Sequence, residues 1–247
     1  MIHYDAYYYG KSGFENCQDY ARAFPELNQV RLSDGCGSSS NSDIGARLLC
    51  LNGGSLLALE EIYLEGIYDI QKEDLFATFL QLGYNKKTSK TSLKVLGDGF
   101  YIEVNKEKFN CYRYYYTENA PKYLVYQSEY IIKNGLEKWK ESFPNNERRI
   151  KLTCERDVVF NISSQGPEYD VELRENEAHL ICSDGLESFV DKDGKKIPYN
   201  NIVKEIVDFK TLNGEFVKRR MIAFRKKCDK LGWKNLDDVS VAGISKT

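Results

Sequence analysis

Residues 30–49 read VRLSDGCGSSSNSDIGARLL, in which a short apolar strand ends at Asp34-Gly35 and a run of small residues leads into a helical pattern. Asn41 or Ser42 can cap the helix that follows. A lone carboxylate at a strand end, followed by residues that let the backbone come close, has two interpretations. Asp-Gly is a common turn dipeptide, and carboxylate oxygens are also the ligands that hard divalent cations prefer. The rest of the chain has to decide between a turn and a metal site.

The composition is that of an ordinary globular protein. The chain has 247 residues, of which 42% are hydrophobic and 29% charged, with a formal net charge of −2. This balance lacks the basic surface that nucleic-acid binding requires. No stretch approaches the roughly 18 apolar residues of a membrane-spanning helix, and the N-terminus does not resemble a signal peptide. We find no repeat or Pro-rich linker, and we expect a single domain over residues 1–247 with no nucleic-acid or membrane partner.

The cysteines argue for a reducing environment. There are seven, an odd number without close pairs, which argues against a disulfide framework and favours a cytoplasmic protein. Without CxxC pairs, and with only two histidines, a Cys/His zinc site is not expected. The abundant tyrosines are interpreted as half-buried strand residues rather than as ligand-stacking groups.

Strand patterns dominate and are predicted over residues 2–9, 20–34, 75–83, 109–116, 122–130, 151–155, 158–162, 169–173, 178–185 and 237–246. A further strand pair is predicted around the turn Gly97-Asp98-Gly99, within residues 92–104. Helical patterns follow Ser42 and extend over residues 55–70, 136–142, 200–209 and 214–233. Because this order lacks the alternation of a parallel βαβ sheet, it predicts an α+β fold in which antiparallel sheets are layered with helices.

Acidic residues recur at the ends of these strands: Asp19, Asp34, Asp98, Asp184, Asp237 and Asp238. Asp34, Asp98 and Asp184 are each followed by Gly, which permits a tight turn and lets a carbonyl face a ligand. Carboxylates gathered at one end of a sheet suit Mg²⁺ or Mn²⁺. Two such ions roughly 3.5–4 Å apart form a site for metal-assisted hydrolysis, commonly of phosphoesters. Taken singly, Asp98 is a hairpin turn, Asp184 a helix N-cap and Asp237 a solvated loop charge, so only their joint order supports a metal site.

That order resembles the metal-dependent protein phosphatases of type 2C, in their bacterial-type branch. The matching motifs are Cys17-Gln18-Asp19, Ser33-Asp34-Gly35-x-Gly37, Gly97-Asp98-Gly99, Cys182-Ser183-Asp184-Gly185-Leu186 and Asp237-Asp238-x-Ser240. They extend from about residue 10 to residue 244. Each is weak alone, whereas five in this order are fairly specific. The resemblance implies a four-layer α-β-β-α sandwich of two antiparallel sheets flanked by helices. It also implies hydrolysis of phosphoserine and phosphothreonine at a binuclear Mn²⁺ or Mg²⁺ centre, without a covalent intermediate.

The resemblance also implies roles for individual residues. Asp34 matches the carboxylate that bridges both metals, and the Gly35 carbonyl matches a ligand of one of them. Asp184 and Asp237 match ligands of the other metal. Asp19 matches the last acid of the first motif, close to the metals. Asp34 and Asp19 are therefore the expected catalytic pair.

Three further expectations follow from the resemblance. Asp98, together with Asp184, matches the acids that hold a third metal in some members. A water that bridges the metals is expected to be the nucleophile, since two cations stabilise hydroxide. The expected partners are a phosphorylated protein substrate and a cognate Ser/Thr kinase.

Three positions depart from the family pattern. Gln18 replaces a common Glu, so that one metal is held less tightly, although other bacterial members carry Gln there. Cys36 replaces a common His that is a candidate general acid, and a thiol is a poor substitute at neutral pH. The phosphate-binding Arg before the first motif is missing, and Phe14 lies near its place. Lys11, or less directly Arg22, is the candidate replacement, with a solvated surface charge as the alternative for each.

Two alternatives to the enzyme stay open. The departures would suit a pseudophosphatase that keeps the fold for binding. An α+β protein with turn aspartates and no metal would instead place the acids apart in space. The basic segment over residues 217–230, VKRRMIAFRKKCDK, is interpreted as a solvated amphipathic helix, with a docking face for a phosphoprotein as the alternative.

Overall fold

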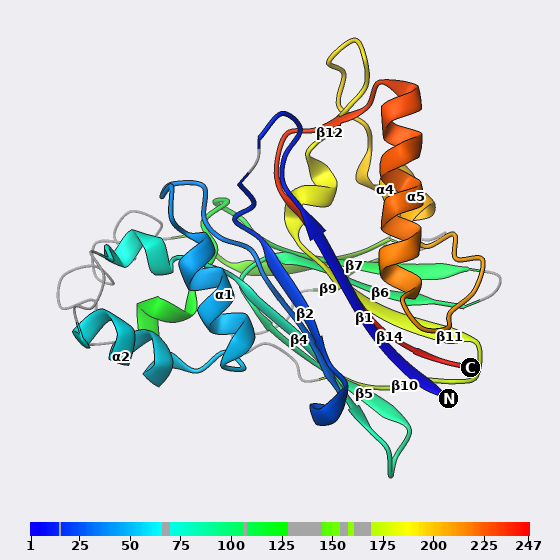
Figure 1. Ribbon diagram of the computed structural model, residues 1–247, viewed down its shortest axis with the longest axis horizontal. Helices are drawn as coiled ribbons and strands as arrows, with labels where there is room; N and C mark the ends of the chain where they lie inside the picture. The colour runs from blue at the N-terminus through cyan, green and yellow to red at the C-terminus, as the bar shows by residue number, and fades with distance from the viewer. Residues whose placement is uncertain (15, 66–69, 106–107, 128–144, 154–157, 161–168) are drawn as a thin grey trace.

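The computed structural model describes residues 1–14, 16–65, 70–105, 108–127, 145–153, 158–160 and 169–247. Two antiparallel β-sheets lie face to face in it, with helices on both outer sides (Figure 1). The expected α+β fold, a four-layer sandwich of two antiparallel sheets flanked by helices, is therefore confirmed.

Among the described residues the larger sheet has seven strands and the smaller sheet five, and the strands of the larger sheet lie in the order β1-β14-β11-β6-β7-β8-β9. Their bounds are β1 Ile2–Tyr9, β6 Gly99–Val104, β7 Phe109–Tyr116, β8 Arg148–Thr153, β9 Val158–Phe160, β11 Glu177–Cys182 and β14 Val239–Lys246. The strands of the smaller sheet lie in the order β10-β5-β4-β3-β2. Their bounds are β2 Tyr20–Phe24, β3 Gln29–Ser33, β4 Phe79–Asn85, β5 Lys90–Leu96 and β10 Tyr169–Glu172. The short strands β12 Phe189–Val190 and β13 Lys234–Asn235 pair with each other.

The described helices cover the two sheets separately (Figure 1). Helix α1 Asp43–Leu51 packs on β2 and β3 of the smaller sheet, and α2 Leu56–Glu65 packs on α1. Helix α5 Phe216–Leu231 packs on β1 and β14 of the larger sheet, beside α4 Tyr199–Ile206. Single turns of 3₁₀-helix occur at η1 Pro25–Leu27, η2 Lys72–Leu75, η3 Leu124–Gln127 and η4 Asp184–Glu187. No helix within the described ranges is long and apolar enough to cross a membrane.

The strands of the larger sheet have two buried faces, and their apolar residues therefore serve two different cores. In β11, Leu180 and Cys182 face α4 and α5, whereas Ile181 faces the smaller sheet. The period of two along a strand explains this division. A third core, which includes Leu49 and Phe79, lies between α1 and the smaller sheet. Each fully buried Leu or Phe side chain contributes about 1.5–3 kcal/mol to stability.

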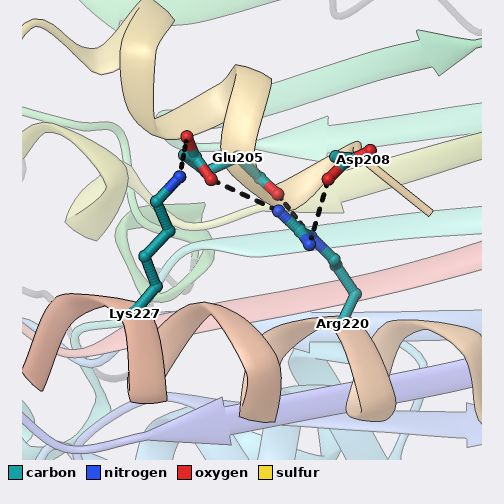
Figure 2. A network of polar contacts seen from close by, with 4 residues as sticks. All are labelled: Glu205, Asp208, Arg220 and Lys227. Carbon is teal, nitrogen blue, oxygen red and sulfur yellow. Dashed lines mark hydrogen bonds and ion pairs between the residues drawn. The ribbon is translucent and has the colours of Figure 1, made fainter. Parts of the chain in front are cut away.

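An ion-pair network joins α4 to α5 (Figure 2). Lys227 Nζ lies 2.6 Å from Glu205 Oε1, and the Arg220 guanidinium lies 3.4 Å from Glu205 Oε2 and 3.3 Å from Asp208 Oδ2. These two cations of the basic segment are thus engaged within the chain, while Lys226 on the same helix is exposed. Buried residues such as Phe224 hold the opposite face of α5 on the sheet, as the amphipathic pattern predicts.

Several predicted elements differ in detail. Residues 20–34 form two strands, because Asn28 adopts the left-handed conformation (φ 55°) that reverses the chain after η1. Within 75–83 the strand begins only at Phe79. Within 122–130 the described part is the η3 turn rather than a strand. The helix expected over 136–142 lies outside the described residues.

The strand pair predicted around Gly97-Asp98-Gly99 is wrong. Strand β5 before this turn belongs to the smaller sheet and β6 after it belongs to the larger one. Gly97 and Gly99 have φ values of 106° and 135°, a region that side chains other than glycine rarely enter. The turn therefore carries the chain from one sheet to the other, and Asp98 lies at the crossing.

Candidate functional site

Asp34 stands where the smaller sheet ends. Its backbone N–H donates to Thr78 Oγ1 at 3.1 Å, and the Thr78 N–H donates to the Asp34 carbonyl at 2.9 Å. Gly35 continues this pairing as an isolated bridge to Ala77. A Cβ on Gly35 would lie 2.8 Å from both the Gln18 carbonyl and the Ser42 carbonyl. The residue after Asp34 therefore has no room for a side chain, which keeps the turn tight.

Asp184 and Asp237 are brought together by two neighbouring strands of the larger sheet. Asp184 follows the end of β11 and Asp237 precedes β14, and these strands are antiparallel partners. Ser183 and Ser240 lock the junction, since the Ser240 N–H donates to Ser183 Oγ at 3.0 Å. A Cβ on Gly185 would lie only 1.7 Å from the Asp238 carbonyl oxygen. The two acidic loops are therefore in direct backbone contact.

Asp19 is the most deeply buried acid of the group, with 1% of its surface exposed. Neither of its carboxylate oxygens has a hydrogen-bond partner of normal geometry. Burial raises the pKa of Asp19 to about 7, although Asp34, Ser183 and Ser240 lie close enough to oppose that shift. A buried carboxylate with unsatisfied oxygens is costly unless a cation accompanies it.

Asp98 approaches the same place from the sheet crossing. Burial and the charge of Asp184 raise the pKa of Asp98 to about 7, and the guanidinium of Arg113 opposes this shift. Arg113 lies on β7 opposite Phe100 and pairs with Glu187, to which its Nη2 donates at 2.9 Å. Glu187 is the last residue of η4, the turn that begins at Asp184.

The electrostatics of Asp34 show that these acids lie together. Burial raises the pKa of Asp34 well above its usual range, and the charges of Asp19, Asp184 and Asp237 raise it further. Five aspartates from separate parts of the chain thus interact at one end of the sandwich. Within the described ranges, however, no three His, Cys, Asp or Glu side chains stand close enough to form a finished metal cage.

This group of residues fits a hard divalent cation. Its side chains offer carboxylate oxygens, the ligand type that Mg²⁺ and Mn²⁺ prefer. The unsatisfied oxygens of Asp19 and the mutual repulsion recorded in the raised pKa of Asp34 would both be relieved by positive charge. Asp34, Asp98 and Asp184 are only half-buried and Asp237 is exposed, so that the group is open to solvent on one side.

Asp238 has a structural role that differs from that of Asp237. Its carboxylate accepts hydrogen bonds from the backbone N–H of Lys11, at 2.7 Å, and from that of Gln18. It therefore fastens both ends of the loop between β1 and β2 to the start of β14. Asp237, the other acid of the pair, accepts a hydrogen bond from the Asp238 N–H at 2.9 Å, and the charge of Asp184 acts on it.

The residues at the departing positions have definite contacts. The Gln18 side chain donates to the Ser39 carbonyl, and the Cys36 thiol lies 3.1 Å from Ser38 Oγ. Lys11 Nζ lies 4.5 Å from the centre of the Phe14 ring. Partial burial raises the pKa of Asp237, and the charge of the Lys11 ammonium opposes that shift. The other candidate, Arg22, lies 5.2 Å from the Phe24 ring within the β2–β3 hairpin.

Arg113 and Tyr123 are neighbours of the acids that the sequence does not reveal. Both lie in aromatic stretches, FNCYRYYY and KYLVY, that resemble ordinary strands. Their proximity to the acids depends on strand order, which no local pattern encodes. A cavity of about 600 Å³ is lined by Asn105 and Phe209 beyond the far end of β6, away from the acids.

The fold is that of the PP2C-type serine/threonine phosphatases. The solved structures that share it include PstP/Ppp of Mycobacterium tuberculosis, with a TM-score of 0.53, 13% identity and coverage of 99% of this chain and 98% of that one. PppA of Pseudomonas aeruginosa, called a key regulatory component of T6SS, has a TM-score of 0.54, 13% identity and coverage of 100% and 98%. The S. agalactiae serine/threonine phosphatase has a TM-score of 0.53, 12% identity and coverage of 100% of both chains. No protein-family model and no curated protein matches the chain in sequence.

Proposed function

We propose that this chain is a metal-dependent phosphatase that hydrolyses phosphoserine and phosphothreonine esters of a protein substrate. The observation that carries the proposal is the meeting of five aspartates at the end of a PP2C-type sandwich, where burial and the charges of Asp19, Asp184 and Asp237 raise the pKa of Asp34. The structural neighbours support the choice, because the catalytic domain of PstP is known in complex with two manganese ions. We further propose a cytoplasmic location and a cognate Ser/Thr kinase that supplies the phosphorylated substrate.

The residues that would hold two Mn²⁺ or Mg²⁺ ions are Asp34, which would contact both, the Gly35 carbonyl, Asp184 and Asp237, with Asp19 close by. Asp98 with Asp184 would serve a third ion. Such ions supply Lewis acidity: they neutralise the phosphoryl group and lower the pKa of water. The chain's own contribution is close packing of the backbone, since neither Gly35 after Asp34 nor Gly185 after Asp184 has room for a side chain.

Lys11 is the proposed contact for the phosphoryl group. The charge of its ammonium acts on Asp237, and a phosphate dianion that approaches the acids would attract this cation. The backbone of Lys11 is fixed by Asp238, so the side chain extends from an anchored position. A lysine binds phosphate as a point charge rather than through a bidentate contact, which suits a supporting role beside the ions.

A second candidate function is a pseudophosphatase that binds a phosphoprotein without turning it over. The observation that favours it is the Gln18 side chain, which is neutral and donates to the Ser39 carbonyl instead of facing the acids. Cys36 likewise contacts Ser38 and offers no ready proton donor at neutral pH. A binding module would retain its partner when Asp34 and Asp184 are neutralised, whereas an enzyme would lose turnover.

The deciding experiment measures hydrolysis of p-nitrophenyl phosphate and of a phosphothreonine peptide with Mn²⁺, with Mg²⁺ and with EDTA. We expect turnover that requires the metal and falls at least about a hundredfold in Asp34→Asn and Asp184→Asn. Asp193→Asn, in an exposed loop, is the matched control and should retain wild-type rates. Folded wild-type protein that binds Mn²⁺ in calorimetry but shows no turnover would favour the binding module instead.

A further inference from the structure

Three aromatic side chains form a half-buried wall beside the acids, made of Phe76, Tyr123 and Tyr126. The rings of Phe76 and Tyr123 are stacked, with centroids 5.5 Å apart and an interplanar angle of 16°. Tyr126 packs edge-on against Phe76 at 5.3 Å and lies 5.6 Å from Tyr123. Such contacts fix ring positions as well as adding stability, so the Tyr123 hydroxyl is held by two neighbouring rings.

The aromatic wall is attached to the turn that carries Asp34. The Cys36 N–H donates to the Phe76 carbonyl at 2.8 Å, and Gly35 bridges Ala77. Phe76 is therefore in backbone register with the residues that directly follow Asp34. Because Tyr123 stacks on Phe76, its position relative to the acids is set by the same pairing.

The hydroxyl of Tyr123 faces this turn. It contacts the Cys36 thiol, and the charges of Asp34 and Asp98 act on it, in addition to the burial that chiefly raises its pKa. The hydroxyl is thus a neutral O–H donor throughout the physiological pH range. Sulfur is a weak acceptor, so an oxygen with negative charge would readily replace Cys36 as the acceptor.

Tyr123 and Lys11 interact with different members of the group of acids. The charge of Lys11 acts on Asp237, whereas the charges of Asp34 and Asp98 act on Tyr123. A lysine ammonium suits the phosphoryl group. The half-buried aromatic wall suits the organic part of the ester, because it offers apolar surface together with the Tyr123 hydroxyl as a donor.

We propose that Tyr123 is a catalytic residue that donates a hydrogen bond to the ester oxygen of the phosphoserine or phosphothreonine side chain as that oxygen leaves. This inference rests on the proposed phosphatase function and adds a residue to it. In the balanced reaction the oxygen of water bonds to phosphorus, the phosphorus–ester bond breaks, and a proton from that water ends on the serine or threonine oxygen. Tyr123 keeps its own proton and stabilises the charge that develops on the leaving oxygen.

The ester oxygen's chemistry makes the proposal testable. An alkoxide leaving group concentrates its negative charge on the oxygen, whereas p-nitrophenolate spreads it over the ring and needs little help. Loss of one hydrogen bond to developing charge costs about tenfold in rate. That loss should be visible for an alkyl ester and nearly absent for p-nitrophenyl phosphate.

The test compares Tyr123→Phe with wild type by the ratio of kcat/KM for a phosphothreonine peptide to kcat/KM for p-nitrophenyl phosphate. This ratio is independent of the folded fraction of a preparation. We expect it to fall about tenfold in Tyr123→Phe, with kcat rather than KM affected. Tyr84→Phe, whose hydroxyl lies 3.5 Å from Ser89 Oγ at the far end of β4, should leave the ratio unchanged.

The possible results distinguish a failure of the role proposed for Tyr123 from a failure of the proposed phosphatase function. An unchanged ratio in Tyr123→Phe, whether both substrates are spared or both slowed equally, would overturn the role of Tyr123 while leaving the phosphatase intact. A series of aryl phosphates gives a second measure, since the dependence of kcat/KM on leaving-group pKa should be steeper in the variant. Wild-type protein without turnover on any ester would overturn both proposals together.

Discussion

At Gly185 the backbone of Asp238 occupies the space that a side chain would need. A Cβ there would lie 1.7 Å from the Asp238 carbonyl oxygen, a separation at which the two loops must move apart. Gly35 is similarly enclosed, by the carbonyls of Gln18 and Ser42. At neither residue is the φ angle left-handed, so the requirement for glycine is one of space and not of backbone conformation.

We therefore expect Gly185→Ala to destabilise the fold by about 3 kcal/mol, because overpacking against rigid backbone has few routes of relief. The measurement is the urea concentration at the midpoint of unfolding, compared between variant and wild type with an unchanged dependence of the unfolding free energy on urea concentration. Gly194→Ala is the matched control: its φ is 77° but a Cβ meets nothing within 4 Å, so only about 1 kcal/mol of backbone strain is expected. Equal costs in the two variants would contradict the steric argument.

At the scale of elements, the features of the site that depend on the order of strands in the sheets could not be predicted from the sequence. The acids at the strand ends could be predicted because each motif is local, and the strand over residues 177–182 could be predicted because it is mostly apolar. The sheet change at Gly97-Asp98-Gly99 could not, since two strands joined by a short glycine turn look like a hairpin whichever sheets they enter. Tyr123 was hidden for the same reason: its neighbours are Phe76 and Cys36, far away in sequence.

The loop between β1 and β2 depends on one carboxylate. Asp238 accepts from the N–H groups of Lys11 and Gln18, and hydrogen bonds to a charged group are worth about 1.5–3 kcal/mol. In Asp238→Ala we expect these two amide protons to exchange with solvent at least about tenfold faster by NMR. Asp191→Ala removes a similar acceptor from another loop and should leave both amides unchanged. Unaltered exchange in Asp238→Ala would show that other contacts hold the loop.

At the scale of the whole molecule, the packing of one sheet on the other buries a histidine. His179 on β11 has 2% of its surface exposed. Its Nδ1 lies 2.6 Å from Thr91 Oγ1 on β5 and 3.2 Å from the Tyr101 hydroxyl on β6. Burial lowers the pKa of His179 to about 4, so the two-sheet sandwich is stable only with a neutral imidazole.

The resulting pH dependence has a definite sign. Because the folded-state pKa of His179 is below the value of about 6.5 in the unfolded chain, the unfolded state binds the proton first as pH falls. Stability is therefore lost between about pH 6.5 and pH 4, by up to about 3 kcal/mol. Buried acids such as Asp19 and Asp98, whose pKa values are raised to about 7, act in the opposite direction.

The contribution of His179 is therefore isolated by comparing wild type with a variant that lacks the imidazole, because the buried acids are common to both. The free energies of unfolding of wild type and of His179→Gln are measured by urea titration between pH 7.5 and pH 4. The wild-type value minus the variant value should become smaller as the pH is lowered. His3→Gln is the control, because His3 is far less buried than His179 and should give a much smaller change. A flat difference for His179→Gln would mean that the imidazole is solvated in the native protein.

The glycines that have no space for a side chain also affect how far the sequences of proteins with this fold can diverge. Cores accept many combinations of apolar residues of similar total volume, which is how chains of 12–13% identity can share this sandwich. Positions filled by backbone have no such freedom. At Gly35 and Gly185 the atoms that a Cβ would meet first include backbone carbonyl oxygens. In distant relatives we expect the equivalents of Gly35 and Gly185 to remain glycine while the apolar residues around them change, so that the spacing of these two is a better signature for finding further members than any run of core residues.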